Sequence, residues 1–227
     1  LPLIQKGHWN MDLAELKKSP HLSASSIGDY VECGLLFKLG RIDKLQPEFR
    51  ADALEFGSAI HLTLGSYYEL KLAGDVLLLK DIHADFENVW RNVAYGRNDI
   101  RYSEGEDFES LLMKGKDLLT VWYNKLPEND FTVLAVEEPF SFQVPGVSIP
   151  IIGAIDLIEE DEEGTVIITD FKTTGRAYST AEIDNNMQLT IYQMAMKANG
   201  FGGRDILLKF DCLIKTKQPK FAQYFSI

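Results

Sequence analysis

Long apolar runs are missing from the sequence, and none approaches the roughly 20 residues that a membrane-spanning helix needs. The N-terminal stretch "LPLIQKGHWN" also lacks a basic region followed by a long apolar one, so we expect no signal peptide. Two cysteines, Cys33 and Cys212, are too few and too far apart for a disulfide framework. These absences predict a cytoplasmic protein with free thiols and no membrane attachment.

An excess of basic residues is missing too, because 23 Lys and Arg face 34 Asp and Glu, for a formal net charge of −11. This balance argues against indiscriminate binding to nucleic acid. It does not exclude an enzyme that acts on nucleic acid, since metal sites are built from carboxylates and a total does not show how charge is distributed. Without an internal repeat or a Pro/Gly/Ser linker, the 227 residues are expected to form a single domain.

The spacing of apolar residues predicts an α/β fold in two parts. Apolar side chains recur at helical spacing in the first part, residues 1–126, where we predict helices at 22–42, 53–72, 82–94 and 108–124 and a loop at 95–107. β-branched and aromatic residues dominate the second part, residues 127–227, where we predict strands at 131–144, 147–160, 165–174, 205–216 and 221–227 and a helix at 187–198. This order predicts a mixed central β-sheet flanked by helices, with a helical N-terminal elaboration beside it.

Charged side chains end the apolar strand "VIITDFKTT", Val166–Thr174. Because strand side chains alternate faces, Asp170 and Lys172 should point to one side and Phe171 to the other. A surface ion pair and a catalytic strand end both explain such a pair. In the preceding strand, Asp156 interrupts an apolar row, and burying an unpaired carboxylate costs several kcal/mol. Counted back from the hairpin tip between them, Asp156 and Asp170 lie at comparable distances, so we expect them to face each other.

Two converging carboxylates repel each other unless a divalent cation lies between them. With Lys172 beside them, they suit metal-assisted phosphodiester hydrolysis, in which the metal acidifies a water and the lysine stabilises charge. The acidic run at the hairpin tip, residues 159–164, could also hold a metal, but a tip exposed to water explains it better. His61, four residues after Gly57 on a predicted helix, is a further candidate, although a lone histidine is more often structural. Gln188 and Tyr192 share one helix face, which a half-buried aromatic beside an exposed amide would also explain.

Taken in order, these features resemble the PD-(D/E)XK nuclease superfamily, and within it the RecB-like branch that includes AddAB helicase–nucleases and CRISPR-associated adaptation nucleases. The similarity covers about residues 22–192. It rests on five motifs: an opening helix with a cysteine, "LSASSIGDYVECGLLFKL"; the G-x-x-x-H of "EFGSAIH"; the acid of "GAIDLIEE"; the D-x-K of "ITDFKTT"; and the Q-x-x-x-Y of "QLTIY".

The resemblance implies a restriction-endonuclease-like core and a role for each motif residue. The implied ligands of Mg or Mn are His61, Asp156, Asp170 and the backbone carbonyl of Phe171. The implied catalytic residues are Asp156, Asp170 and Lys172, while Gln188 and Tyr192 would help position the DNA strand or the catalytic lysine. Glu137 lies where some members carry an additional strand acid.

Two departures from the family pattern narrow the expectation. Many relatives hold an iron–sulfur cluster with one cysteine near the first helix and three near the C-terminus. Cys33 occupies the first position, but residues 210–227 supply no group of three, so we predict no cluster on this chain. A G-x-x-x-x-G-K-[ST] loop is also missing, so any helicase partner would be a separate chain.

The sequence therefore predicts a metal-dependent DNA nuclease, an exonuclease acting at DNA ends or on single strands in recombination, repair or related DNA processing. Two alternatives are a non-catalytic nucleic-acid-binding scaffold with the nuclease fold and a hydrolase of another phosphoester. The intact set of Asp156, Asp170 and Lys172 argues against the scaffold.

Overall fold

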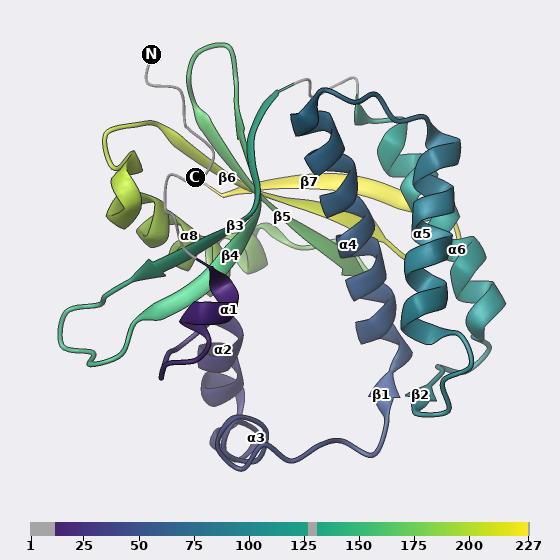
Figure 1. Cartoon of the computed structure of the whole chain (residues 1–227), viewed down its shortest axis with the longest axis horizontal. Coiled ribbons are helices and arrows are strands. Elements are labelled where there is room, and N and C mark those ends of the chain that lie inside the picture. Colours follow the sequence, from purple (N-terminus) through teal and green to yellow (C-terminus); the bar gives the residue numbers. More distant parts are fainter. Residues whose placement is uncertain (1–11, 127–130, 227) are drawn as a thin grey trace.

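A five-stranded mixed sheet forms the centre of the computed structural model, which describes residues 12–126 and 131–226 (Figure 1). The strands lie in chain order: β3 (Thr132–Phe142), β4 (Ile151–Glu160), β5 (Val166–Thr174), β6 (Ile206–Ile214) and β7 (Lys220–Ser226). Only the pairing of β5 with β6 is parallel among these neighbours, because the chain between them crosses over through a helix. The predicted mixed sheet flanked by helices is confirmed.

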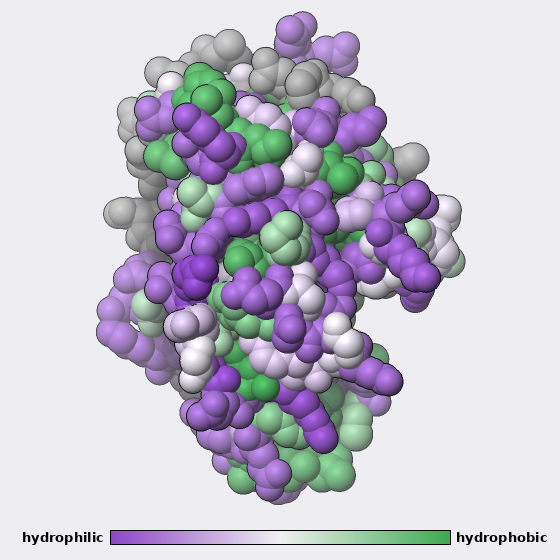
Figure 2. Space-filling model, turned by 90° about the vertical axis from the view of Figure 1, so that its right-hand side faces the viewer, coloured by the Kyte–Doolittle hydropathy of each residue, from purple (hydrophilic) through white to green (hydrophobic). Residues whose placement is uncertain are grey.

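Helices cover both faces of the sheet. One face packs against the long helices α4 (Asp52–Ala73) and α6 (Phe108–Tyr123), and α5 (Leu79–Ala94) packs against these two helices. The other face packs against α8 (Met187–Met196) and the short α7 (Thr180–Asp184). Each layer has its own apolar core, with Trp90 and Trp122 in the first and Phe140 and Phe210 in the second. Figure 2, which views the molecule from the side of α5 and α6, shows mostly hydrophilic side chains there, with smaller apolar patches in its upper and lower parts.

Local signals explain where the long helices start, stop and meet. Asp107 caps α6 by accepting a hydrogen bond from the backbone N–H of Ser110, and the Ser110 hydroxyl accepts one from Asp107 N–H in return. Gly74 ends α4 in a left-handed conformation, with φ of 94°. Helices α5 and α6 approach closely at Gly115, where a Cβ atom would lie 2.1 Å from Phe86 Cζ. Gly115 therefore sets the spacing of the two helices.

The single helix predicted over residues 22–42 is wrong. Cys33 has extended backbone angles, and the segment divides into α2 (Ala24–Glu32), α3 (Gly34–Phe37) and the π-helical turn η1 (Lys38–Ile42). The break falls beside Gly34, and glycine within a helix costs about 1 kcal/mol relative to alanine. The predicted apolar stripe is largely exposed, as at Val31 and Leu35, since no further layer of the described chain covers it. This segment projects from the core as an arm (Figure 1).

Short elements that the sequence did not indicate connect the layers. They are α1 (Leu13–Leu16), β1 (Arg50–Ala51), β2 (Ile100–Arg101), the short α7 described above and the π-helical turn η3 (Lys197–Phe201). β1 pairs in parallel with β2, which lies inside the predicted loop and ties the start of α4 to the chain before α6. The predicted hairpin tip is present, and Asp161 accepts hydrogen bonds there from the N–H groups of Glu163 and Thr165. Within the described residues, the helices are all too short or too polar to cross a bilayer.

Candidate active site

The site begins where β4 and β5 separate. Their antiparallel ladder runs from Glu160 opposite Val166 to Leu157 opposite Thr169, so the next positions in the same register are Asp156 and Asp170. Asp156 does not continue the ladder through its backbone. Its Oδ2 instead accepts a hydrogen bond of 2.8 Å from the backbone N–H of Phe171. A carboxylate is thus held at the fork between two strands.

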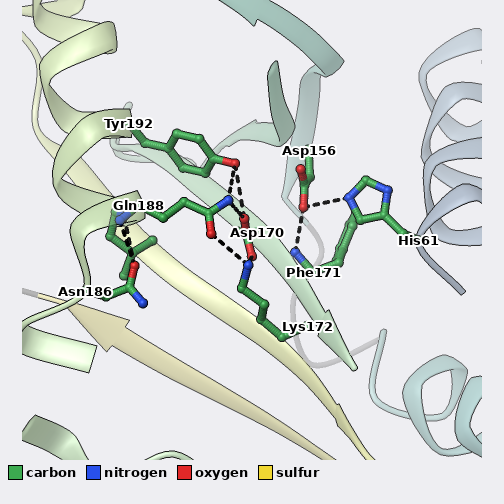
Figure 3. Close-up of polar contacts among 9 residues, drawn as sticks. His61, Asp156, Asp170, Phe171, Lys172, Asn186, Gln188 and Tyr192 are labelled. Atoms are coloured by element: carbon green, nitrogen blue, oxygen red, sulfur yellow. Dashed lines mark hydrogen bonds and ion pairs between the residues drawn. The ribbon is translucent and has the colours of Figure 1, made fainter. Parts of the chain in front are cut away.

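His61 reaches this fork from α4, on the other side of Asp156 (Figure 3). Its Nε2 lies 2.9 Å from Asp156 Oδ2 and its Nδ1 lies 3.3 Å from Glu137 Oε1. Ligand atoms of these three residues all lie within 4.8 Å of one another. Burial by itself lowers the pKa of His61, but the carboxylates of Asp156, Glu137 and Asp170 outweigh it and raise the pKa. The nearby carboxylates therefore favour the protonated imidazole of His61.

Glu137 contributes its carboxylate from an unusual backbone conformation. Its φ is 49°, in the left-handed region, although it lies inside β3 between residues that pair regularly with β4. For a non-glycine residue this conformation costs roughly 1–2 kcal/mol, and such residues gather at functional sites. Burial raises the pKa of Glu137, and the nearby charge of Asp156 adds to the shift, although protonated His61 opposes it. The sequence placed an acid here, but nothing in it indicated the conformation.

Asp170 and Lys172 face α8, as the alternation of strand side chains predicts (Figure 3). Asp170 Oδ1 accepts hydrogen bonds from Gln188 Nε2 at 2.6 Å and from the Tyr192 hydroxyl at 3.1 Å. Lys172 Nζ lies 2.7 Å from Asp170 Oδ2 and donates a hydrogen bond of 2.8 Å to Gln188 Oε1. Asn186 caps α8 by accepting from the N–H groups of Gln188 and Leu189, and so holds the first turn in place.

Burial dominates the electrostatics of this second group. It raises the pKa of Asp170 to about 6, with the Lys172 ammonium opposing the shift and Asp156 adding to it. Burial also tends to lower the pKa of Lys172, but the charge of Asp170 prevails and raises it, so Lys172 is an ammonium. Asp170 Oδ2 is buried and meets that ammonium as an ion pair, without a hydrogen bond from the described residues. The Lys172 ammonium is therefore the cation that neighbours this oxygen in the described chain.

The sequence-derived candidates thus form two groups on either side of Phe171. His61, Glu137 and Asp156 form the first group, and Asp170, Lys172, Gln188 and Tyr192 form the second. Asp170 is not part of the three-residue cluster, and Phe171 joins the site through its N–H. The sequence analysis did not single out Asn186. Its position directly before a predicted helix is typical of an N-cap and could have revealed it.

Two grooves border the site. One, of about 430 Å³, lies between the start of α2 and α8, and its lining includes Asp156, Gln188 and Tyr192. The other, of about 500 Å³, lies between α4 and β5, and its lining includes His61 and Phe171. Each groove therefore contains residues of the site, and together they offer space for a chain-like substrate on both sides.

The family model of the PD-(D/E)XK nuclease superfamily matches residues 21–225, so the chain belongs to this superfamily. Among solved structures, a candidate exonuclease from Eubacterium rectale is similar over 100% of this chain and 79% of its own, with a TM-score of 0.54 and 12% identity. SSO0001 matches over 86% of this chain and 76% of its own, with 18% identity and a TM-score of only 0.32. A search of the curated proteins found no match.

Nucleases of this superfamily use divalent metals, and the side chains at the fork fit such an ion. Carboxylate oxygens are ligands that Mg²⁺ and Mn²⁺ prefer, and imidazole suits a transition metal. His61, Glu137 and Asp156 supply both types within one cluster. Asp170 Oδ2 adds a buried oxygen close by that lacks a hydrogen bond from the described residues. The donor set therefore agrees with the family.

Proposed function

We propose that this protein is a metal-dependent deoxyribonuclease of the RecB-like branch that removes nucleotides from DNA ends or single strands. The observation that carries the proposal is the fork between β4 and β5, where Asp156 and His61 meet Asp170 and Lys172. The G-x-x-x-H of α4 and the Q-x-x-x-Y of α8 support the branch, since both motifs point their side chains into this fork.

Each residue has a chemical task in this proposal. Bound Mg²⁺ or Mn²⁺ would polarise the phosphate and acidify a water, and its holders would be His61, Asp156, Asp170 and, on the geometry, Glu137. Lys172 is charged and held by Gln188, so its ammonium can stabilise the negative charge that develops on the phosphate. The backbone carbonyl of Phe171 remains a proposed ligand.

The exonuclease part of the proposal rests on a structural relative and on the two grooves. The structural relative from Eubacterium rectale is a candidate exonuclease, and the likeness shows the fold alone. Grooves on both sides of the site could carry an extended strand. A helicase on a separate chain would supply single strands in recombination or repair, and this partner belongs to the same proposal.

Digestion of linear DNA tests the function. The parent and Lys172→Ala would be incubated with end-labelled linear DNA, a closed circle and Mg²⁺ or Mn²⁺, with EDTA as the metal-free control. We expect the parent to degrade the linear DNA only with metal and to spare the circle. Lys172→Ala should be slower by about 10²–10³-fold, as expected when one transition-state donor is lost.

Each other outcome changes the proposal in a defined way. Cutting of the closed circle would make the protein an endonuclease. Cleavage of RNA but not DNA would contradict the proposal that DNA is the substrate. DNA binding without hydrolysis in either metal would support the non-catalytic scaffold.

A further inference from the structure

The groove between α4 and β5 is unusual in the side chains that line it. On its helical side lie six residues of the exposed face of α4: Ala53, Leu54, Gly57, Ser58, His61 and Leu62. Within this described segment, 53–62, the only Asp, Glu, Lys or Arg is Glu55, and its side chain is buried. Leu54 and Leu62 are 71% and 55% exposed.

A solvent-facing helix surface normally carries charged or polar side chains. The exposed face of α4 instead carries Leu54 and Leu62, each four residues from Ser58, so the three side chains lie on one stripe of the helix. Single exposed leucines are ordinary, but an apolar lining within a groove indicates a binding surface. The volume of about 500 Å³ falls within the roughly 300–1,000 Å³ usual for ligand sites.

The groove is continuous with the candidate active site. His61 belongs both to its lining and to the cluster with Asp156 and Glu137. Phe171, whose N–H binds Asp156, and Thr173 line it from β5. A molecule with one end at the metal ligands would therefore have its neighbouring part in this groove.

We propose that the groove holds the nucleoside adjoining the phosphate that is cut, with its base unpaired and packed against Leu54 and Leu62. This inference rests on the proposed nuclease function. A nucleoside is uncharged and has flat apolar faces, which suits a lining without charged side chains other than His61 at its inner end. Apolar packing against bases tolerates any sequence, so the groove would select single strands rather than particular bases. A duplex end would have to open before cleavage.

Gly57 gives direct access to this groove. A Cβ atom at Gly57 would meet no heavy atom of the described chain within 4 Å, so a larger side chain there would project into the groove. Leucine is also a better helix former than glycine, so Gly57→Leu should keep the fold. Gly34 in α3 offers a matched control, since its Cβ would likewise meet nothing within 4 Å in the described chain and it does not line this groove.

The test compares a single-stranded oligonucleotide with the same strand carrying one abasic residue. Parent, Gly57→Leu and Gly34→Leu would be assayed for cleavage at each linkage in Mg²⁺ or Mn²⁺, and for binding by fluorescence anisotropy in EDTA. We expect the parent to slow about tenfold, or about 1.4 kcal/mol, at the linkage beside the abasic residue. Gly57→Leu should cut the intact strand about tenfold more slowly and lose nothing further at the abasic position. Gly34→Leu should behave as the parent.

The inference is overturned if Gly57→Leu cuts the intact strand as fast as the parent, or if the abasic residue slows both equally. A change in oligomeric state in Gly57→Leu without any effect on DNA would also overturn it, because the groove would then be a protein-packing surface. If the parent cuts no strand, the proposed function fails, and the binding measurements alone then test whether the groove holds a nucleoside. Intact and abasic strands must then differ in affinity for the parent and not for Gly57→Leu.

Discussion

Gln188 and Lys172 are joined by a hydrogen bond of 2.8 Å, in which the amide oxygen accepts from the ammonium. The amide nitrogen of the same side chain donates to Asp170 Oδ1. One glutamine therefore fixes both the charged lysine and the carboxylate beside it, and its own position depends on the cap of α8. Gln188 therefore helps to set the direction in which the Lys172 ammonium points, together with the ion pair to Asp170.

Replacing Gln188 by leucine should remove the hydrogen bond that orients Lys172 while leaving the metal-ligand side chains in place. We expect kcat for DNA cleavage to fall about tenfold or more with KM nearly unchanged, since a hydrogen bond to a charged group contributes about 1.5–3 kcal/mol. Steady-state kinetics on single-stranded DNA measures the split. Gln193→Leu, on the same helix but outside these bonds, is the control. An equal rise of KM in Gln188→Leu would show that Gln188 binds the strand instead.

The backbone of Glu137 predicts a difference between two small replacements. Both Glu137→Ala and Glu137→Gly remove the carboxylate, so both should weaken Mn²⁺ binding measured by calorimetry. Only glycine adopts the positive φ without strain. The free energy of unfolding of Glu137→Gly should therefore be about 1 kcal/mol higher than that of Glu137→Ala. Urea denaturation without metal compares them. Equal stabilities would mean that the left-handed conformation carries no cost.

A second charged cluster is buried on the face of the sheet covered by α6. Lys209 Nζ lies 3.5 Å from Glu159 Oε2 and 3.6 Å from Asp211 Oδ2, and all three side chains are 2% exposed. Glu159 Oε2 has no hydrogen-bond partner among the described residues. Burial raises the pKa of Glu159 to about 7, although the Lys209 ammonium opposes the shift.

This shift predicts that stability falls as pH rises. The folded pKa of Glu159 lies above its usual value of 4.5, so the folded state holds the proton more tightly than the unfolded state. The stabilisation is complete below about pH 4.5 and is lost as pH rises through about 7, by roughly 1–3 kcal/mol. Glu159→Gln should flatten this dependence in urea denaturation at pH 5 and pH 8. A variant with the parent's slope would contradict the assignment.

The contact between α5 and α6 predicts a steric effect. Gly115→Ala would place a Cβ atom against the ring of Phe86, which is fully buried and cannot move aside. We expect a loss of about 1–3 kcal/mol in the free energy of unfolding, as for other overpacked cores. Gly34→Ala, with open space around its Cβ, should be neutral or stabilising. Thermal unfolding of the two variants gives the comparison.

Much of the site followed from the sequence because it depends on local geometry. A hairpin's register is fixed by its turn, so counting from the tip placed Asp156 level with Asp170. Strand alternation placed Lys172 beside Asp170, and helical spacing placed Gln188 with Tyr192. The role of each residue in catalysis stays a prediction.

Other features depend on tertiary contacts that a pattern does not contain. The exposed arm shows an apolar stripe like that of a core helix, and only the absence of a covering layer in the described chain makes it different. The positive φ of Glu137 arises where β3 meets β4 beside the fork. The groove between α4 and β5 is lined by residues from both elements, so it depends on how α4 packs beside the sheet.

The fork between β4 and β5 also bears on the order in which the protein folds. Asp156 and Phe171 are 15 residues apart, so the hairpin brings the carboxylates together through a short loop with a small entropic cost. His61 comes from much earlier in the chain and arrives only when α4 docks on the sheet. We therefore expect the carboxylates to face each other without the imidazole between these two events. Recovery of metal affinity during refolding would therefore time the docking of the helical layer.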